Sequence, residues 1–304
     1  MIQDIFPHHL NNSFIQGKEQ SEEDLVLCLK GDRVFLLETE GAGGMLRFPK
    51  VSEYPGVRRD YSGGGQMRTA PDGNLQYLFT VDETALFLDL KVPSEDEVFT
   101  GGGFFSVRRD LRGTGRLEPE WVFAAHTAYH LSVWYRDNRH CGRCGCAVVP
   151  AKDERAVDCP SCHNRIYPRI NPAVIVGVTN QDKLLITRYA DRPLSVDALV
   201  AGFTEIGETF EETVAREVME EAGLHVKNIR YYKSQPWGMA SDILAGFFCD
   251  VDGDPQVHLD RHELKSALWI PREEIKGQPD NLSLTNEMML LFRDGKEPHF
   301  DEYK

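Results

Sequence analysis

The sequence predicts an α/β fold for its C-terminal half, because strand-like and helix-like stretches alternate there. Short runs rich in valine, isoleucine and leucine indicate strands. Between them, Phe210, Val214 and Val218 place an apolar side chain every four positions, which is typical of an amphipathic helix. Alternating strands and helices favour helices packed on a mixed sheet. The expected strands are residues 173–178, 183–188, 228–233, 243–251 and 264–270, with a closing helix at residues 286–292.

The first 138 residues predict a separate part of α+β type. The chain has 304 residues, and this length favours about two domains. Residues 118–138 carry a helical pattern that we interpret as the helix leading out of the first domain. The expected strands before it are residues 25–29, 33–37, 75–81 and 85–90.

Composition and charge narrow the function classes. The net charge of -14 argues against broad electrostatic binding to nucleic acid, which needs a basic surface. No N-terminal stretch combines a basic region with an apolar core, so we expect no secretory signal. The apolar run at residues 173–178 is far too short to cross a membrane. Seven cysteines without a secreted context favour a reduced, cytoplasmic setting.

Two CxxC pairs, Cys141 with Cys144 and Cys159 with Cys162, predict a metal centre. Two such turns bring four thiolates together in the tetrahedron that structural zinc prefers. Two disulfides or a redox pair are the alternatives. A reduced compartment disfavours disulfides, and no βαβ pattern surrounds either pair to support a redox motif. Four protein ligands would close the site, so we expect this zinc to stabilise the fold and not to catalyse.

Residues 202–224 join a glycine-rich turn to a helix with clustered carboxylates. Glu217 lies three residues before Glu220 and four before Glu221, so we expect these carboxylates to converge on one exposed patch of the helix. Three acids at short range repel one another. A hard divalent cation such as Mg²⁺ removes that repulsion, because it prefers oxygen ligands. An ordinary acidic surface helix is the alternative.

The order of residues in this stretch resembles a known family. The residues are Gly202-x5-Glu208-x7-Arg216-Glu217-Val218-x-Glu220-Glu221-x-Gly223-Leu224. This pattern resembles the complete signature of the Nudix hydrolases, which cleave nucleoside diphosphates linked to another group. The sequence Ser-Gln-Pro-Trp follows at residues 234–237. Two CxxC pairs, the Nudix signature and this tetrapeptide, in that order, resemble the NADH pyrophosphatase subfamily, whose members are also NAD-capped RNA hydrolase-like.

The resemblance implies three domains and a catalytic centre. An N-terminal α+β domain (residues 1–138) and a small zinc ribbon (residues 139–168) would precede a Nudix α/β/α sandwich with a mixed sheet (residues 169–304). Mg²⁺ or Mn²⁺ would bind and activate the attacking water. The implied ligands are Glu217, Glu220, Glu221, Glu263 and the backbone carbonyl of Ala201.

Two further roles concern the acids and arginine of the signature. Glu220 and Glu263 are both candidates for the general base, and the sequence does not choose between them. We expect Arg216 to orient Glu208 and the helix carboxylates through charge-assisted hydrogen bonds.

The resemblance also implies a substrate pocket. Tyr167 and Phe203 would form an aromatic pair around the base of one half of the substrate, with packing as core aromatics as the alternative. The fuller subfamily pattern SQPWPFPxS is not complete here, because residues 238–240 are Gly-Met-Ala and Asp242 replaces the final serine. This departure leaves the ranking of substrates open. The other implied substrate contacts are Gln235, Pro236, Trp237 and Asp242, with Glu154 and Thr285 as weaker ones.

The expected function is therefore hydrolysis of the pyrophosphate bond of NADH or NAD⁺ to nicotinamide mononucleotide and AMP. Removal of an NAD cap from RNA is a variant of this function that the sequence leaves open. The resemblance implies a homodimer, and the short apolar runs predict no membrane partner. Hydrolysis of ADP-ribose or another nucleotide conjugate is the alternative within the same enzyme class. An inactive zinc-ribbon module that binds RNA is the alternative outside it, and the intact acids of the signature and the net charge argue against it.

Overall fold

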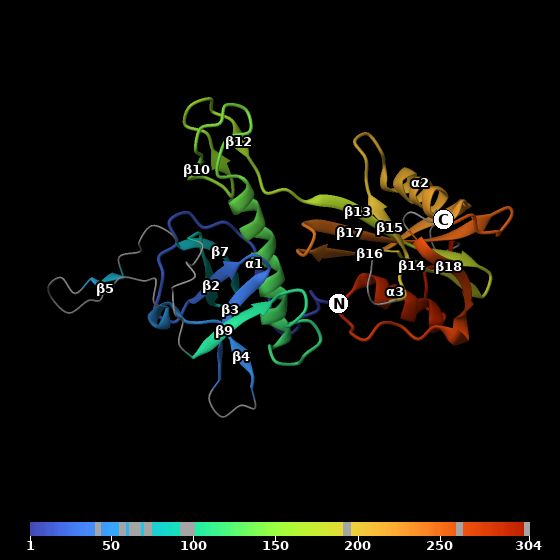
Figure 1. The fold of residues 1–304 in the computed structure, drawn as a ribbon, viewed down its shortest axis with the longest axis horizontal. Helices are drawn as coiled ribbons and strands as arrows, with labels where there is room; N and C mark the ends of the chain where they lie inside the picture. The colour runs from blue at the N-terminus through green and yellow to red at the C-terminus, as the bar shows by residue number, and fades with distance from the viewer. Residues whose placement is uncertain are drawn as a thin grey trace. The chain divides into compact units, whose positions relative to one another are not determined.

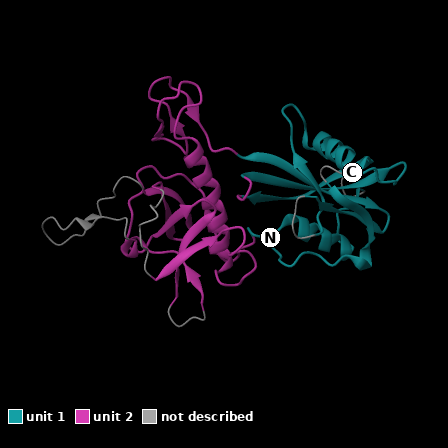
Figure 2. Cartoon of the chain, viewed as in Figure 1, with its two compact units in different colours: residues 1–3, 170–237, 241–304 teal, residues 4–169, 238–240 magenta. Residues whose placement is uncertain are grey.

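The computed structural model describes residues 1–39, 44–54, 59–60, 68–69, 75–91, 101–190, 196–259 and 264–300. The chain divides into two compact units, which Figure 2 distinguishes by colour. Unit 1 comprises residues 1–3, 170–237 and 241–304, and unit 2 comprises residues 4–169 and 238–240. The division into three domains stays a prediction.

Unit 1 contains a mixed sheet of six strands, in the order β16-β17-β13-β14-β18, with β15 also paired to β13. The central strand β13 runs parallel to β17 and antiparallel to β14 and β15. The α/β class and the mixed sheet predicted from the sequence are therefore confirmed. The strands are β13 (Asn171–Asn180), β14 (Lys183–Tyr189), β15 (Val200–Phe203), β16 (His225–Trp237), β17 (Asp242–Asp252) and β18 (Leu264–Pro271).

Helices α2 (Phe210–Ala222) and α3 (Leu284–Arg293) cover opposite faces of this sheet (Figure 1). The cause is the alternation of side chains along β13, since successive residues of a strand point to opposite faces. Val174 packs in one apolar core with Val218 of α2, and Ile175 packs in a second core with Met288 of α3. The two cores give the three-layer α/β/α sandwich that the resemblance implied.

Local signals fix both ends of α2. Thr209 caps the start, where its hydroxyl accepts a hydrogen bond from the Glu212 N–H and the Glu212 carboxylate accepts one from the Thr209 N–H. Gly223 ends the helix at φ 66°, a left-handed conformation that favours glycine. A Cβ at this position would also lie 2.7 Å from the Cβ of His258. Helix α2 therefore has a fixed length and position against the sheet.

Unit 2 is built on a seven-stranded sheet in the order β1-β7-β8-β2-β3-β4, with β9 also paired to β3. Strands β2 and β8 pair in parallel. Helix α1 (Pro119–Asp137) contacts β2 and β7 and agrees within one residue at each end with the predicted helix. The strands are β1 (Leu10–Asn11), β2 (Leu25–Lys30), β3 (Arg33–Glu38), β4 (Leu46–Arg47), β7 (Leu75–Val81), β8 (Thr84–Asp89) and β9 (Gly102–Ser106).

Shorter elements complete both units. A small three-stranded sheet in unit 2 consists of β10 (Val149–Pro150), β11 (Val157–Asp158) and β12 (Arg165–Ile166). The remaining elements are the two-stranded pair β5 (Arg59–Asp60) and β6 (Arg68–Thr69) and the 3₁₀ helices η1 (Val51–Glu53) and η2 (Arg272–Glu274). None of the helices in the described part of the chain has the length and apolar character needed to cross a membrane.

Candidate active site and zinc centre

The four predicted cysteine ligands come together next to the small sheet of unit 2. Their sulfur atoms all lie within 4.8 Å of one another. The Cys141 and Cys162 sulfurs are 3.6 Å apart, and those of Cys144 and Cys159 are 3.4 Å apart. Sulfurs around a tetrahedral zinc with Zn–S bonds of about 2.3 Å lie roughly 3.8 Å apart. All four cysteines are free of disulfides. The donor atoms and their spacing therefore fit one structural zinc ion.

Backbone N–H groups donate to two of these thiols, one in each CxxC turn. The Arg143 N–H donates to the Cys141 sulfur at 3.4 Å, and the Cys162 N–H donates to the Cys159 sulfur at 3.5 Å. The first of these bonds is the main reason why the pKa of Cys141 is lowered to about 6. Backbone donors of this kind stabilise the thiolate, which is the form that binds metal.

We expect purified protein to contain about one zinc ion per chain by elemental analysis. Cys159→Ser removes a ligand and should lower the zinc content by more than about half at equal protein concentration. Cys146→Ser is the matched control, because Cys146 lies outside the group of four and should leave the zinc content unchanged. Zinc-free protein with two disulfides after purification under reducing conditions would contradict the assignment.

The carboxylates of α2 do not form the exposed patch that we expected. Glu217 is 9% exposed and Glu221 is 1% exposed, whereas Glu220 is exposed. The reason is helical spacing: residues four apart share one face, and this face of α2 lies against β15. A Cβ at position 202 would lie 1.9 Å from Cδ of Glu217. Gly202 is therefore the residue that lets the Glu217 carboxylate lie against the β15 backbone.

Arg216 holds the acids of the signature in place, as predicted. Its Nε and Nη2 donate to the two oxygens of Glu208 at 2.6 and 2.9 Å. Its Nη1 donates to Glu217 at 2.8 Å and to Glu220 at 2.9 Å, and Nη2 also donates to the Phe203 carbonyl at 2.9 Å. The guanidinium is the main reason why the pKa of Glu208 falls to about 2. Glu208 therefore stays ionised and anchors the arginine.

The donor set on α2 suits a hard cation. The carboxylate oxygens of Glu217, Glu220 and Glu221 are the ligand type that Mg²⁺ and Mn²⁺ prefer. Ala201 lies in β15 next to Gly202, in register with Ile175 of β13. Glu263 falls outside the described residues. Within the described ranges, only the four cysteines bring three or more possible ligand atoms within 4.8 Å of one another. The carboxylates of α2 do not form such a group, and two of them, Glu217 and Glu220, instead accept hydrogen bonds from Arg216.

The two aromatic residues of the implied substrate pocket lie at the surface of different units. Phe203 in unit 1 is 52% exposed and Tyr167 in unit 2 is 55% exposed. The alternative that they are core aromatics is therefore wrong. The Tyr167 hydroxyl donates to the Glu154 carboxylate at 2.9 Å, and this bond raises the pKa of Tyr167. Their role in binding a base stays a prediction.

Arg165 is a residue that the sequence analysis missed. Its guanidinium forms two hydrogen bonds with Asp158, at 2.8 and 2.9 Å, and two with Asp153, at 3.0 and 2.9 Å. It also donates to Glu154, the residue that accepts from Tyr167. The ribbon contains four arginines, and Arg155 lies closer than Arg165 to these acids along the chain, so no signal in the sequence singled out Arg165. Arg165 therefore connects the small sheet to the Tyr167 side chain.

The other implied substrate residues lie where β16 ends and where β17 and α3 begin. Gln235 is fully buried, donates to the Leu282 carbonyl at 2.8 Å and accepts from the Leu284 N–H at 2.7 Å, so it ties β16 to the start of α3. Trp237 is half-buried and pairs in register with Asp242. Pro236 is exposed, Asp242 is buried, and Thr285 is half-buried in the first turn of α3. Their contacts with substrate stay predictions.

The chain is similar in sequence to several known proteins. An NAD-capped RNA hydrolase NudC from Shigella dysenteriae serotype 1 is 42% identical over 153 residues, which cover 50% of this chain and 59% of that protein. The protein of the same name from Photobacterium profundum is 37% identical over 171 residues, which cover 56% and 63%. The chain thus spans less than two thirds of the length of these curated relatives. A solved NUDIX hydrolase from Nitrosomonas europaea covers 52% of this chain and 92% of its own, at 21% identity and a TM-score of 0.46.

Two family descriptions match adjacent stretches of the sequence. Residues 169–290 match the NUDIX domain, and they include the carboxylate helix and its glycine-rich turn. Residues 136–167 match the NADH pyrophosphatase zinc ribbon domain, and they include all four cysteine ligands. The chain therefore carries a NUDIX domain that is preceded by a zinc ribbon of the NADH pyrophosphatase type.

Proposed function

We propose that this protein is a metal-dependent hydrolase that cleaves the pyrophosphate bond of NADH or NAD⁺ into nicotinamide mononucleotide and AMP. The arrangement of Glu217 against Gly202, with Arg216 holding Glu208, Glu217 and Glu220, is the observation that carries the proposal. The zinc ribbon of the NADH pyrophosphatase type supports a dinucleotide substrate. The relatives named NAD-capped RNA hydrolase support an NAD cap on RNA as a further substrate.

The reaction needs a water molecule to attack phosphorus while negative charge grows on the phosphoryl oxygens. A divalent cation bound to Glu217, Glu220 and Glu221 would supply charge neutralisation and a more acidic water. Glu208 and Arg216 keep the helix carboxylates in one orientation through the bonds described above. The exposed Glu220 can receive the proton of the water, and Glu263 is the other candidate base.

Phe203→Ala should reduce kcat/KM for NADH far more than for ADP-ribose. ADP-ribose keeps the adenine and both phosphates and lacks only the nicotinamide. If Phe203 stacks on nicotinamide, its removal costs about 1–3 kcal/mol for NADH, the range for a base stacked on an aromatic side chain. Wild-type protein should therefore prefer NADH, and the variant should lose much of that preference. Product formation in Mg²⁺ with each substrate measures it.

Ile206→Ala is the matched control for this experiment. Ile206 is fully exposed, at 103%, on the loop that follows Phe203. Truncation of Ile206 should leave kcat/KM unchanged for both NADH and ADP-ribose. Equal losses for NADH and ADP-ribose in Phe203→Ala would refute the nicotinamide contact and would assign the ring to adenine, while the pyrophosphatase assignment would stand.

ADP-ribose or another nucleotide conjugate is the second candidate substrate. This candidate is favoured by the departure from the subfamily pattern after Trp237, where residues 238–240 are Gly-Met-Ala and Asp242 replaces serine. ADP-ribose should therefore be tested beside NADH and NAD⁺.

We further propose a homodimer that works in the reduced cytoplasm. This setting is supported by the seven cysteines, none of which forms a disulfide. Light scattering of the purified protein tests the dimer.

A further inference from the structure

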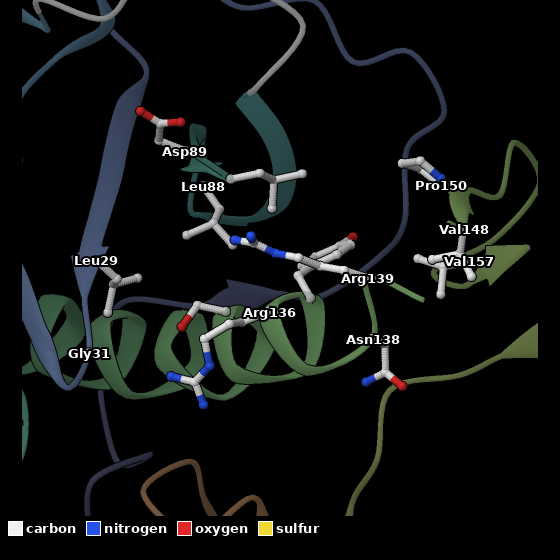
Figure 3. Close-up of a pocket in the computed structure, with 13 residues that line it drawn as sticks. Leu29, Gly31, Leu88, Asp89, Arg136, Asn138, Arg139, Val148, Pro150 and Val157 are labelled. Atoms are coloured by element: carbon white, nitrogen blue, oxygen red, sulfur yellow. The ribbon is translucent and has the colours of Figure 1, made fainter. Parts of the chain in front are cut away.

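Unit 2 contains a pocket that plays no part in the proposed reaction. It has a volume of about 240 Å³ and lies where the end of β8, the last turns of α1 and the small sheet of the zinc ribbon meet (Figure 3). Liquid water occupies about 30 Å³ per molecule, so the pocket has room for roughly eight waters. It is therefore large enough for a small organic molecule and too small for a dinucleotide.

The walls of the pocket are mostly apolar. Leu29 and Leu88 come from the sheet of unit 2, and Val148 and Val157 come from the zinc ribbon. Tyr135 adds an aromatic ring from α1, and burial raises the pKa of its hydroxyl, which keeps it neutral. Apolar walls with a few polar groups are the usual composition of a small-molecule site.

One cation in this pocket is not engaged by the protein. Figure 3 shows the Arg139 side chain extending across the pocket toward Leu88. In the residues that the structure describes, the Arg139 guanidinium forms no hydrogen bond and no ion pair. Arg136, the other arginine of the lining, pairs with Asp137 at 2.9 Å and points away from Leu88 in the same view. Arg139 is therefore available to a ligand.

Asp89, the single acid that lines the pocket, already accepts hydrogen bonds from the protein on both of its oxygens. Asp89 accepts the Tyr54 hydroxyl at 2.6 Å on one oxygen and the Lys91 N–H at 2.8 Å on the other. Its charge remains at the edge of the pocket and opposes a ligand with more than one negative charge. Arg139 therefore offers attraction for one anionic group.

We propose that this pocket binds a small monocarboxylate with a flat or branched apolar body. The planar guanidinium of Arg139 can donate two parallel hydrogen bonds to a carboxylate, a geometry that arginine forms readily. The ring of Tyr135 and the side chains of Leu88 and Val148 cover the apolar body. This binding site is separate from the carboxylate helix of the NUDIX domain and does not depend on the proposed hydrolysis.

Benzoate is the probe that tests the proposal, by isothermal titration into the full chain. It should bind one site per chain with a dissociation constant on the order of 1 mM, a scale expected for a ligand of this size. Benzamide has the same shape without the charge and should bind at least ~10-fold more weakly. Inorganic phosphate has charge without an apolar body and should show no saturable binding at the same concentrations.

Two variants locate the site. Arg139→Gln should weaken benzoate binding at least ~10-fold, whereas Arg136→Gln, the matched control, should bind like the wild type. Val148→Phe narrows the pocket from the ribbon side without changing charge and should also weaken binding. Zinc content verifies that each variant keeps its ribbon folded.

Nuclear Overhauser contacts between benzoate and the methyl groups of Leu88 and Val157 should appear in the wild type. Absence of benzoate binding at about 20 mM, twenty times the expected dissociation constant, would overturn the proposal. Equal binding of benzamide, or benzoate binding that Arg139→Gln leaves unchanged, would overturn it as well.

Discussion

Glu221→Gln and Glu217→Gln will each lower kcat for NADH hydrolysis by at least ~10²-fold, on the scale of removing one group that stabilises the transition state. Each substitution removes a negative charge and keeps nearly the same shape. Both side chains lie buried on the face of α2 that packs against β15, where an amide is a poorer ligand for a divalent cation. Initial rates in Mg²⁺ and in Mn²⁺ measure the effect.

Glu211→Gln is the control for this pair. Glu211 lies exposed in the first turn of α2, whereas the two buried carboxylates lie in its later turns. It should retain wild-type kcat. Circular dichroism should show an unchanged fold for all three variants. Near wild-type rates in both Glu217→Gln and Glu221→Gln would mean that this cluster is not the active site.

Gly202→Ala will cost activity on a similar scale, at least ~10²-fold in kcat. The added Cβ would lie 1.9 Å from Cδ of Glu217 and about as close to both of its oxygens, at 2.0 and 2.2 Å. The carboxylate must then move away from β15 and from its bond with Arg216. Because the defect is in the position of a catalytic carboxylate, kcat should fall more than KM rises.

Gly142→Ala separates this effect from a general cost of replacing glycine. A Cβ at position 142 meets no atom within 4 Å, so this variant should keep full activity. If Gly202→Ala hydrolyses NADH at the wild-type rate, then the close approach of Glu217 to β15 does not matter for catalysis.

The sequence predicted those parts of the fold in which local pattern decides the structure. Strand β13 contains a continuous apolar run at residues 173–178, and residues 210, 214 and 218 of α2 are apolar, so both elements were found from local pattern. Strand β15 was missed, because four residues with a glycine carry no clear period. The parallel pairing of β2 with β8 joins segments far apart in the chain, and no local signal announces it.

In the candidate site, too, the sequence predicted the features that depend on local pattern and missed those that depend on contacts between distant segments. The zinc ligands were predictable because two CxxC turns define both the ligands and their geometry. The burial of Glu217 could not be predicted from the sequence, because it depends on the contact between α2 and the Gly202 backbone in β15. We expected Gln235 to contact the substrate. The structure shows that it also accepts a hydrogen bond from the Leu284 N–H at the start of α3. Its neighbours along the chain gave no sign of that contact.

The identity of the products tests the central claim most directly. Incubation of the protein with NADH and Mg²⁺ in ¹⁸O-labelled water, followed by mass spectrometry, should give reduced nicotinamide mononucleotide and AMP, with one labelled oxygen in one of the two phosphates. Glu221→Gln should leave NADH intact over the same time. Intact NADH with the wild type, or free nicotinamide released by cleavage of the glycosidic bond, would contradict a pyrophosphatase centred on the carboxylates of α2.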